Sequence, residues 1–206
     1  MPSNSPTNDP DGPLPAGTLY VVATPIGNLD DITIRALKTL SAVDLIAAED
    51  TRHTKRLLDR HALPAGRQIS CHEHNEAERV AQLLAALREG KTVALVSDAG
   101  TPGVSDPGYR LVQAARAAGF SVVPIPGASA AVTALSAAGL PTDAFLFVGF
   151  PPRKQGALKR DLAALAAQRA TLIFYESPRR LLTLLQALRD ALGDRRAVLA
   201  LSLIHI

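Results

Sequence analysis

The sequence has a single cysteine, Cys71, among its 206 residues, so it cannot form a disulfide within the chain. It also lacks any apolar run near the roughly 20 residues that a membrane-spanning helix needs. Residues 1–16 are rich in proline, serine and asparagine but have neither a basic start nor an apolar segment. They predict a disordered leader and not a signal peptide. These absences favour a soluble protein of the reducing cytoplasm, without membrane contact.

Three common kinds of site are also missing. No Gly-x-Gly-x-x-Gly follows the first apolar run, which argues against dinucleotide binding. Gly90-Lys91-Thr92 resembles the end of a P-loop, but Ala85 stands where the first glycine belongs. A helix is also expected before this segment, where a P-loop requires a strand. The histidines have no zinc-like spacing with a second cysteine, so no metal is predicted.

The net charge of +3 conceals an uneven distribution. Residues 1–150 contain 12 Lys and Arg against 15 Asp and Glu, a balance of −3, whereas residues 151–206 contain 10 against 4, a balance of +6. A basic second half predicts an anionic macromolecular partner. A solvated helix surface explains the same charge equally well.

Short apolar runs alternate with amphipathic, helix-length segments throughout the chain. This alternation predicts an α/β fold with a mostly parallel sheet covered on both faces. In the first half we expect strands at 19–23, 43–48, 68–71, 92–96 and 121–123, and helices at 31–40, 76–88 and 109–118.

The pattern restarts near residue 141, which predicts a domain boundary between residues 139 and 140. The first domain then covers 17–139 and a second α/β domain covers 140–206. In the second we expect strands at 144–150, at 171–175 and from Ala197 onward, and helices at 155–167 and 178–192. Residues 197–206 are nearly all apolar and would form an unprotected edge strand, so we expect a truncated or mis-joined terminus and an incomplete second domain.

The most informative segment is the glycine-rich stretch from Ser97 to Gly108. It follows an expected strand and precedes an expected helix, and open α/β sheets bind ligands at that position. Asp98, at the strand end, is suited to accept hydrogen bonds from a ligand amine or ribose, and Asp106 stands where a helix N-cap belongs. An elaborate turn is the alternative, but twelve residues are long for a turn, so a binding loop is favoured.

Other strands are followed by comparable loops. Residues 24–28 and 126–130 each carry a glycine after a strand, and the amides near Ser129 begin a helix, which favours a ligand carboxylate. Two polar clusters, 49–54 and 72–76, also follow strands, as a catalytic cleft requires. Helix capping by Thr51 or Asn75 is the alternative for single residues.

Two turns in the second half combine an aromatic side chain with paired basic residues. They are residues 150–154, Phe-Pro-Pro-Arg-Lys, and residues 175–180, Tyr-Glu-Ser-Pro-Arg-Arg. Aromatic rings stack on nucleotide bases and cations contact phosphates, so both turns favour RNA binding. Capping and solvation remain the alternative for each basic pair.

These segments, taken in order, resemble a known family. The stretches GTLYVVATPIGN, AAEDTRHT, SCHEHNE, VSDAGTPGVSDPG, PGASA, FVGFPPRK and FYESPRR are similar to those of tetrapyrrole-methylase-like methyltransferases. The similarity is strongest to the subgroup that methylates a cytidine ribose 2′-hydroxyl in 16S rRNA. It runs from about Gly17 to Ala200, and the sequence departs from the family pattern after that point.

The resemblance implies two α/β domains, a homodimer, and S-adenosylmethionine bound between the domains. It implies 16S rRNA of the 30S subunit as the partner. The implied cofactor contacts are Pro25, Ile26, Gly27, Ser97, Asp98, Ala99, Ser129, Ala130, Tyr175 and Glu176.

For the chemistry we hypothesise Glu49 or Asp50 as the acceptor of the hydroxyl proton. Arg52 would orient a phosphate, and His74 or Asn75 would hold the nucleotide. The expected RNA-backbone contacts are Arg153, Lys154, Arg179 and Arg180. A methylase of a tetrapyrrole or other small molecule, and a non-catalytic RNA-binding protein, are the alternatives.

Overall fold

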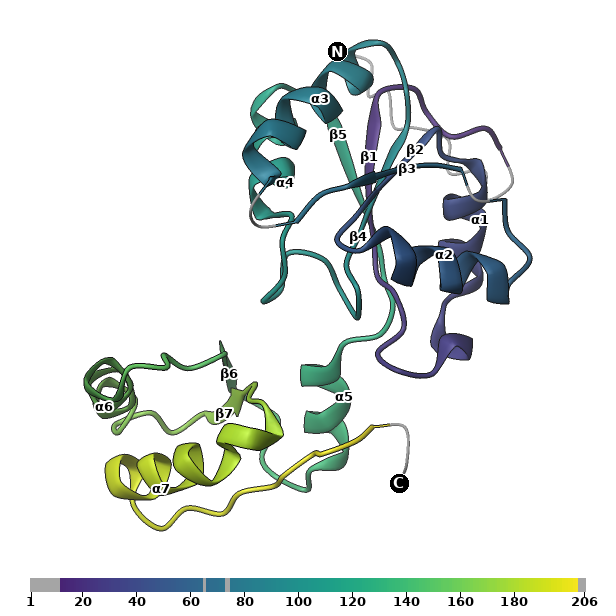
Figure 1. Ribbon diagram of the computed structural model, residues 1–206. Coiled ribbons are helices and arrows are strands. Elements are labelled where there is room, and N and C mark those ends of the chain that lie inside the picture. Colours follow the sequence, from purple (N-terminus) through teal and green to yellow (C-terminus); the bar gives the residue numbers. More distant parts are fainter. Residues whose placement is uncertain (1–11, 65, 73–74, 204–206) are drawn as a thin grey trace. The chain divides into compact units, whose positions relative to one another are not determined.

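The computed structural model describes residues 12–64, 66–72 and 75–203. It divides after Ser129 into two compact units, each described here by itself (Figure 1). This division lies one helix before the boundary that we expected after Gly139, because α5 (Ala130–Ala137) is grouped with the second unit. Of the expected leader, residues 1–11 lie outside the described residues.

Unit 1 is built on a five-stranded sheet in which every pairing is parallel. The order across the sheet is β3-β2-β4-β1-β5. This confirms the expected α/β class with a mostly parallel sheet. The strands are β1 (Thr18–Val22), β2 (Leu45–Ala48), β3 (Arg67–Ser70), β4 (Val93–Val96) and β5 (Ser121–Ile125).

Helices cover both faces of this sheet (Figure 1). Successive strand residues point to opposite faces, so Leu19 and Leu95 pack in one core cluster while Tyr20 and Val96 pack in the other. Burial on both faces explains why β2 and β4 are buried along their whole length. The first cluster includes α3 (Glu76–Arg88) and α4 (Tyr109–Ala117), and the second includes α1 (Ile34–Ala42) and α2 (Thr51–Arg60).

The N-terminal side of α1 differs from the expectation. The helix expected from Asp31 begins at Ile34, because Leu29–Asp31 forms a short 3-10 helix, η1. The Asn28 side chain caps η1 by accepting from the backbone N of Asp30, and the Thr33 hydroxyl caps α1 by accepting from the backbone N of Ala36. Two successive side-chain caps therefore divide the segment into two helices.

Unit 2 contains two parallel strands, β6 (Phe145–Gly149) and β7 (Thr171–Phe174). Its small core consists of Leu158, Leu162 and Leu184. These leucines come from two packed helices, α6 (Gln155–Ala164) and α7 (Leu181–Leu192). A 3-10 turn, η2 (Pro178–Arg180), precedes α7, where a proline at the first turn suits a helix start.

The prediction of a strand from Ala197 onward is wrong. Within the described residues, 195–203 have neither helix nor strand structure. Apolar composition predicts burial, but a strand also needs a neighbouring strand for its backbone hydrogen bonds. Among the described strands, β6 and β7 pair only with each other. Among the described helices none is long and apolar enough to cross a bilayer.

Candidate active site

The carboxyl ends of β1 and β4 form the natural ligand position of unit 1. These strands are neighbours, yet β1 leads through α1 to β2 on one side of the pair, and β4 leads through α4 to β5 on the other. The helices α1 and α4 therefore cover opposite faces of the sheet, and the carboxyl ends of β1 and β4, where the two connections part, are called the crevice below. Open α/β sheets bind ligands at such a switch point.

The loops after β1 and β4 are joined directly at this crevice. The backbone N of Thr24 donates to the Gly100 carbonyl at 2.9 Å, and the backbone N of Gly100 donates back to the Thr24 carbonyl at 3.1 Å. The Thr24 hydroxyl also donates to the carbonyl of Ser97 at 3.1 Å. Gly100 has φ +81°, a backbone conformation that favours glycine.

The loop after β5 packs against the same two loops. The Thr101 hydroxyl donates to the Ala128 carbonyl at 3.4 Å. A Cβ on Gly127 would lie only 2.9 Å from the Cβ of Ala23, so backbone packs closely here. The structure thus brings together the three glycine-bearing loops that the sequence places after strands.

Asp50 follows β2 and caps α2, and both of its carboxylate oxygens accept hydrogen bonds. Its side chain accepts from the backbone N of Arg52 at 2.8 Å. The Arg52 guanidinium also binds this carboxylate, with Nε at 3.0 and 3.1 Å from its two oxygens and Nη2 at 2.6 Å. The Arg52 side-chain and backbone hydrogen bonds hold the pKa of Asp50 well below its usual range. So weakly basic a carboxylate is poorly suited to accept a proton.

Glu49 and Asp98 connect the segment after β2 to the loop after β4. The backbone N of Asp50 donates to Asp98 Oδ1 at 3.0 Å, and the backbone N of Asp98 donates to Glu49 Oε2 at 3.3 Å. His53 Nδ1 lies 3.1 Å from Asp98 Oδ2. The Asp98 side chain is still 35% exposed, so it can also reach a ligand.

The second polar segment, after β3, extends this network. The Ser70 hydroxyl donates to the Glu49 carbonyl at 3.5 Å. The Asn75 amide donates to the Ser70 carbonyl at 3.1 Å, and its oxygen accepts from the backbone N of His72 at 2.8 Å. Asn75 therefore shapes its own turn. His74, the other residue that we expected to hold a nucleotide, lies outside the described residues.

Asp106 belongs to this edge, although the sequence suggested for it only the role of a helix cap. That suggestion is wrong: α4 begins after Gly108, which takes φ +122°, and no side chain of its own segment caps it. Burial, followed by the negative charge of Glu49, raises the pKa of Asp106 to about 6. The Ser97 hydrogen bond opposes that rise and Asp98 adds to it. An aspartate in a glycine-rich loop was the signal that the sequence offered, but Glu49, which has the larger effect of its two charged neighbours, comes from another segment.

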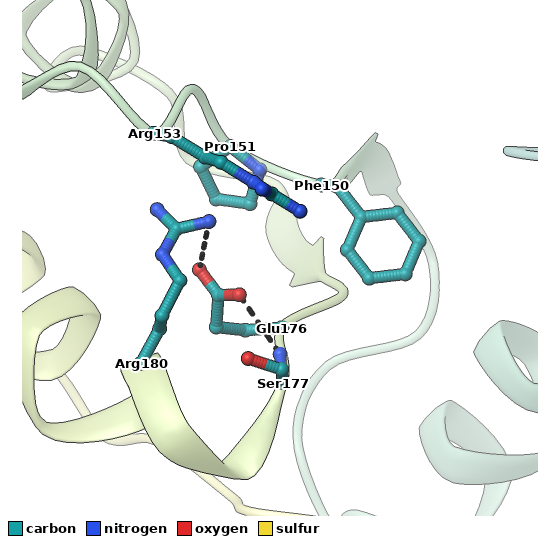
Figure 2. A pocket seen from close by; sticks show the side chains of 6 residues that line it. All are labelled: Phe150, Pro151, Arg153, Glu176, Ser177 and Arg180. Atoms are coloured by element: carbon teal, nitrogen blue, oxygen red, sulfur yellow. Dashed lines mark hydrogen bonds and ion pairs between the residues drawn. The ribbon is translucent and has the colours of Figure 1, made fainter.

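Unit 2 contains the two turns 150–154 and 175–180 that the sequence suggested for RNA binding, and Figure 2 shows side chains from both turns. These turns form a pocket of about 160 Å³, which is lined by Phe150, Pro151, Arg153, Glu176, Ser177 and Arg180.

An ion pair closes one side of this pocket. Arg180 Nη1 lies 3.2 Å from Glu176 Oε2, and the side chains are 29% and 6% exposed. Arg180 also donates to the Pro152 carbonyl at 3.3 Å, and Glu176 Oε1 accepts from the backbone N of Ser177 at 2.8 Å. Arg180 thus supports the turn, whereas Arg153, Lys154 and Arg179 are exposed.

Tyr175 fixes the beginning of the same turn within unit 2. Its hydroxyl accepts from the backbone N of Ala131 at 3.1 Å. Its ring contacts Phe147 and Phe150 edge-on, with centroid distances of 5.0 and 5.4 Å. Edge-to-face packing of this kind fixes ring orientation, so Phe150 presents a positioned ring that is 61% exposed.

Comparison with known families identifies the fold. Residues 18–202 match the family model described as tetrapyrrole (corrin/porphyrin) methylases. The chain belongs to this family. Among solved structures, the chain is similar to uroporphyrin-III-C-methyltransferase of Thermus thermophilus, with a TM-score of 0.57 and 29% sequence identity. The match covers 85% of this chain and 73% of that one. The chain also shares its fold with a cobalt precorrin-4 methyltransferase, with TM-score 0.62, 20% identity and coverage of 87% and 78%.

Curated relatives are more similar in sequence. The proteins named ribosomal RNA small subunit methyltransferase I in Pseudomonas aeruginosa and Mesorhizobium japonicum are 54% and 59% identical, over 90% and 86% of this chain. The match covers 66% and 60% of those two proteins, so this methylase-family chain spans less than two thirds of their length.

Proposed function

We propose that the protein transfers a methyl group from S-adenosylmethionine to the ribose 2′-hydroxyl of a cytidine in 16S rRNA of the 30S subunit, as a cytoplasmic homodimer. The observation that carries this proposal is the 54–59% identity to proteins named for small-subunit rRNA methylation. The two solved structures compared above, which are named for porphyrin and precorrin methylation, are at most 29% identical to this chain.

The crevice of unit 1 fits S-adenosylmethionine by its chemistry. Glycines allow the backbone to approach a ligand closely, and the half-exposed Asp98 carboxylate suits an amine or ribose hydroxyls. The bound cofactor would supply the reactive methyl group. As its contacts we propose the residues that the sequence suggests: Pro25, Ile26, Gly27, Ser97, Asp98, Ala99, Ser129, Ala130, Tyr175 and Glu176.

A ribose hydroxyl is a poor nucleophile, so a nearby proton acceptor helps the reaction. Of the two acceptors proposed from the sequence, Asp50 is occupied by Arg52 and weakly basic. Asp106 is better matched, because its pKa of about 6 lies close to neutral pH. We therefore propose Asp106 as the acceptor, with Glu49 beside it and Arg52 and Asn75 ordering the surrounding segments.

The direct test is methyl transfer to unmodified 30S subunits. We expect labelled methyl from S-adenosylmethionine to be recovered in 2′-O-methylcytidine after nuclease digestion, with the full-length Pseudomonas aeruginosa relative assayed in parallel. Label in a tetrapyrrole but not in RNA would favour the small-molecule alternative. Binding of RNA without binding of cofactor would favour a non-catalytic protein.

Exposed cations of unit 2 should make RNA binding depend on salt. Each Lys or Arg that neutralises a phosphate releases counterions, so changing Arg153 and Lys154 to alanine should lower the slope of log affinity against log salt by about 2. The measurement is 30S binding between about 50 and 300 mM salt. Changing Lys159 and Arg160 on α6 removes the same charge elsewhere and is the matched control. Equal slopes for the two double variants would contradict this assignment.

A further inference from the structure

The start of α4 depends on a side chain from another helix. The backbone N–H groups at a helix N-terminus need acceptors, yet Gly108, at the N-cap position, has no side chain to supply one. The acceptor is Glu76 Oε1, from the first turn of α3, which lies 3.1 Å from the backbone N of Gly108 and 3.2 Å from that of Arg110.

Glu76 is suited to act as a fixed anchor. The residue is 6% exposed, and a buried carboxylate is retained only where hydrogen bonds or cations compensate its charge. The two amides and the N-terminus of α4 provide that compensation, together with Arg110 Nε at 3.8 Å from Oε2. Hydrogen bonds from backbone amides to a charged acceptor are strong, so the start of α4 is firmly held.

The anchored end is the end of the loop that contains Asp98 and Asp106. At Gly108 a Cβ would lie 2.7 Å from Leu95 Cδ2, so the chain presses directly on β4. Within the loop, the backbone N of Gly103 donates to the Pro107 carbonyl at 3.2 Å. Movement of Gly108 away from Glu76 would therefore shift the whole segment that precedes it.

We infer that Glu76 is a positioning residue that couples the segment after β3 to the loop after β4 and so sets the geometry of the cofactor side of the crevice. The contact joins the 72–76 segment, which the sequence suggested for substrate, to residues 97–108, which it suggested for cofactor. The role of this coupling in cofactor binding rests on the proposed function, whereas the anchor itself does not.

The test compares Glu76→Ala with Glu76→Gln, whose amide oxygen can still accept both bonds. Glu78→Ala, an exposed neighbour in the same turn, is the control. In the absence of cofactor, hydrogen exchange at the amides of Gly108 and Arg110 should be about tenfold faster in Glu76→Ala, since one lost hydrogen bond to a charged group is worth at least that factor. Binding of S-adenosylmethionine, measured by calorimetry, should weaken about tenfold in Glu76→Ala, and Glu76→Gln should restore it to within about threefold.

Unchanged exchange and unchanged cofactor affinity in Glu76→Ala would overturn the inference, as would a Glu76→Gln variant no better than alanine. If the alanine variant does not fold, Glu76→Asp replaces it: the shorter side chain should not reach the amides, so wild-type behaviour in it would equally overturn the anchor. If the unaltered chain binds no cofactor, the proposed function fails, while amide exchange still decides the anchor.

Discussion

Replacing Asp106 with asparagine is expected to slow methyl transfer about 100-fold, the usual contribution of a positioned proton acceptor. The same substitution should make the folded chain more stable near pH 8. The two effects have one physical cause. The Asp106 carboxylate is half-buried and lies near the negative charges of Glu49 and Asp98, so its charged form is unfavourable. For this reason its pKa is raised to about 6.

The sign of the stability effect follows from proton linkage. The pKa of Asp106 is 3.8 in the absence of the fold and about 6 in it, so between these values the folded state binds more protons than the unfolded state. Stability from this group is therefore fully present below about pH 4 and is lost as pH rises through about 6. Asparagine cannot ionise and avoids that loss. Because the group is partly exposed, the gain near pH 8 should be on the order of 1 kcal/mol.

The measurement is urea denaturation near pH 4 and pH 8, together with methyl transfer under single-turnover conditions. Asp50→Asn is the matched control, because asparagine can still cap α2 and the carboxylate it replaces is already neutralised by Arg52. Its transfer rate should remain within about fivefold of the unaltered chain, well below the effect expected for a proton acceptor. An Asp106→Asn variant with normal transfer, or with equal destabilisation at both pH values, would remove Asp106 from the proposed mechanism.

Much of this fold could be predicted because burial imposes clear patterns. The amphipathic spacing of Val80, Leu83 and Leu87, followed by Gly90, defined α3 to the residue. The sequence pattern predicted all five strands of unit 1 to within a few residues, and a parallel sheet necessarily collects the loops after its strands at one edge. The placement of loops 24–28, 97–108 and 126–130 at a common crevice therefore followed from topology.

The site chemistry could not be predicted in the same way. Whether an aspartate is bound by an arginine or is crowded by other carboxylates depends on how the folded chain arranges the charged groups around it. Asp50 and Asp106 look alike in sequence, but one is stabilised by Arg52 and the other is crowded by carboxylates. In the sequence Glu76 is only part of the polar cluster 72–76, whereas in the structure its carboxylate binds the start of α4. The apolar segment from Ala197 also shows that a strand depends on a partner as well as on composition.

Replacing Arg180 with alanine should lower the stability of the chain by about 2–4 kcal/mol, because it leaves the buried Glu176 carboxylate without its cation. The estimate is below that for a fully buried pair, since Arg180 itself is 29% exposed. From the sequence alone Arg180 was expected to contact the RNA backbone. That role predicts a change in RNA affinity with stability altered by less than about 0.5 kcal/mol, as for other surface substitutions.

A double-mutant cycle separates the two roles. Glu176→Gln removes the charge that Arg180 compensates, so combining it with Arg180→Ala should recover at least half of the lost stability. Urea denaturation of the four proteins gives the coupling energy, and 30S binding of the same proteins gives the RNA contribution. Arg153→Ala, which removes an exposed cation on the same pocket, should reduce RNA binding without changing stability (Figure 2). If Arg180→Ala behaves like Arg153→Ala in both measurements, the ion pair is dispensable and Arg180 acts on RNA directly.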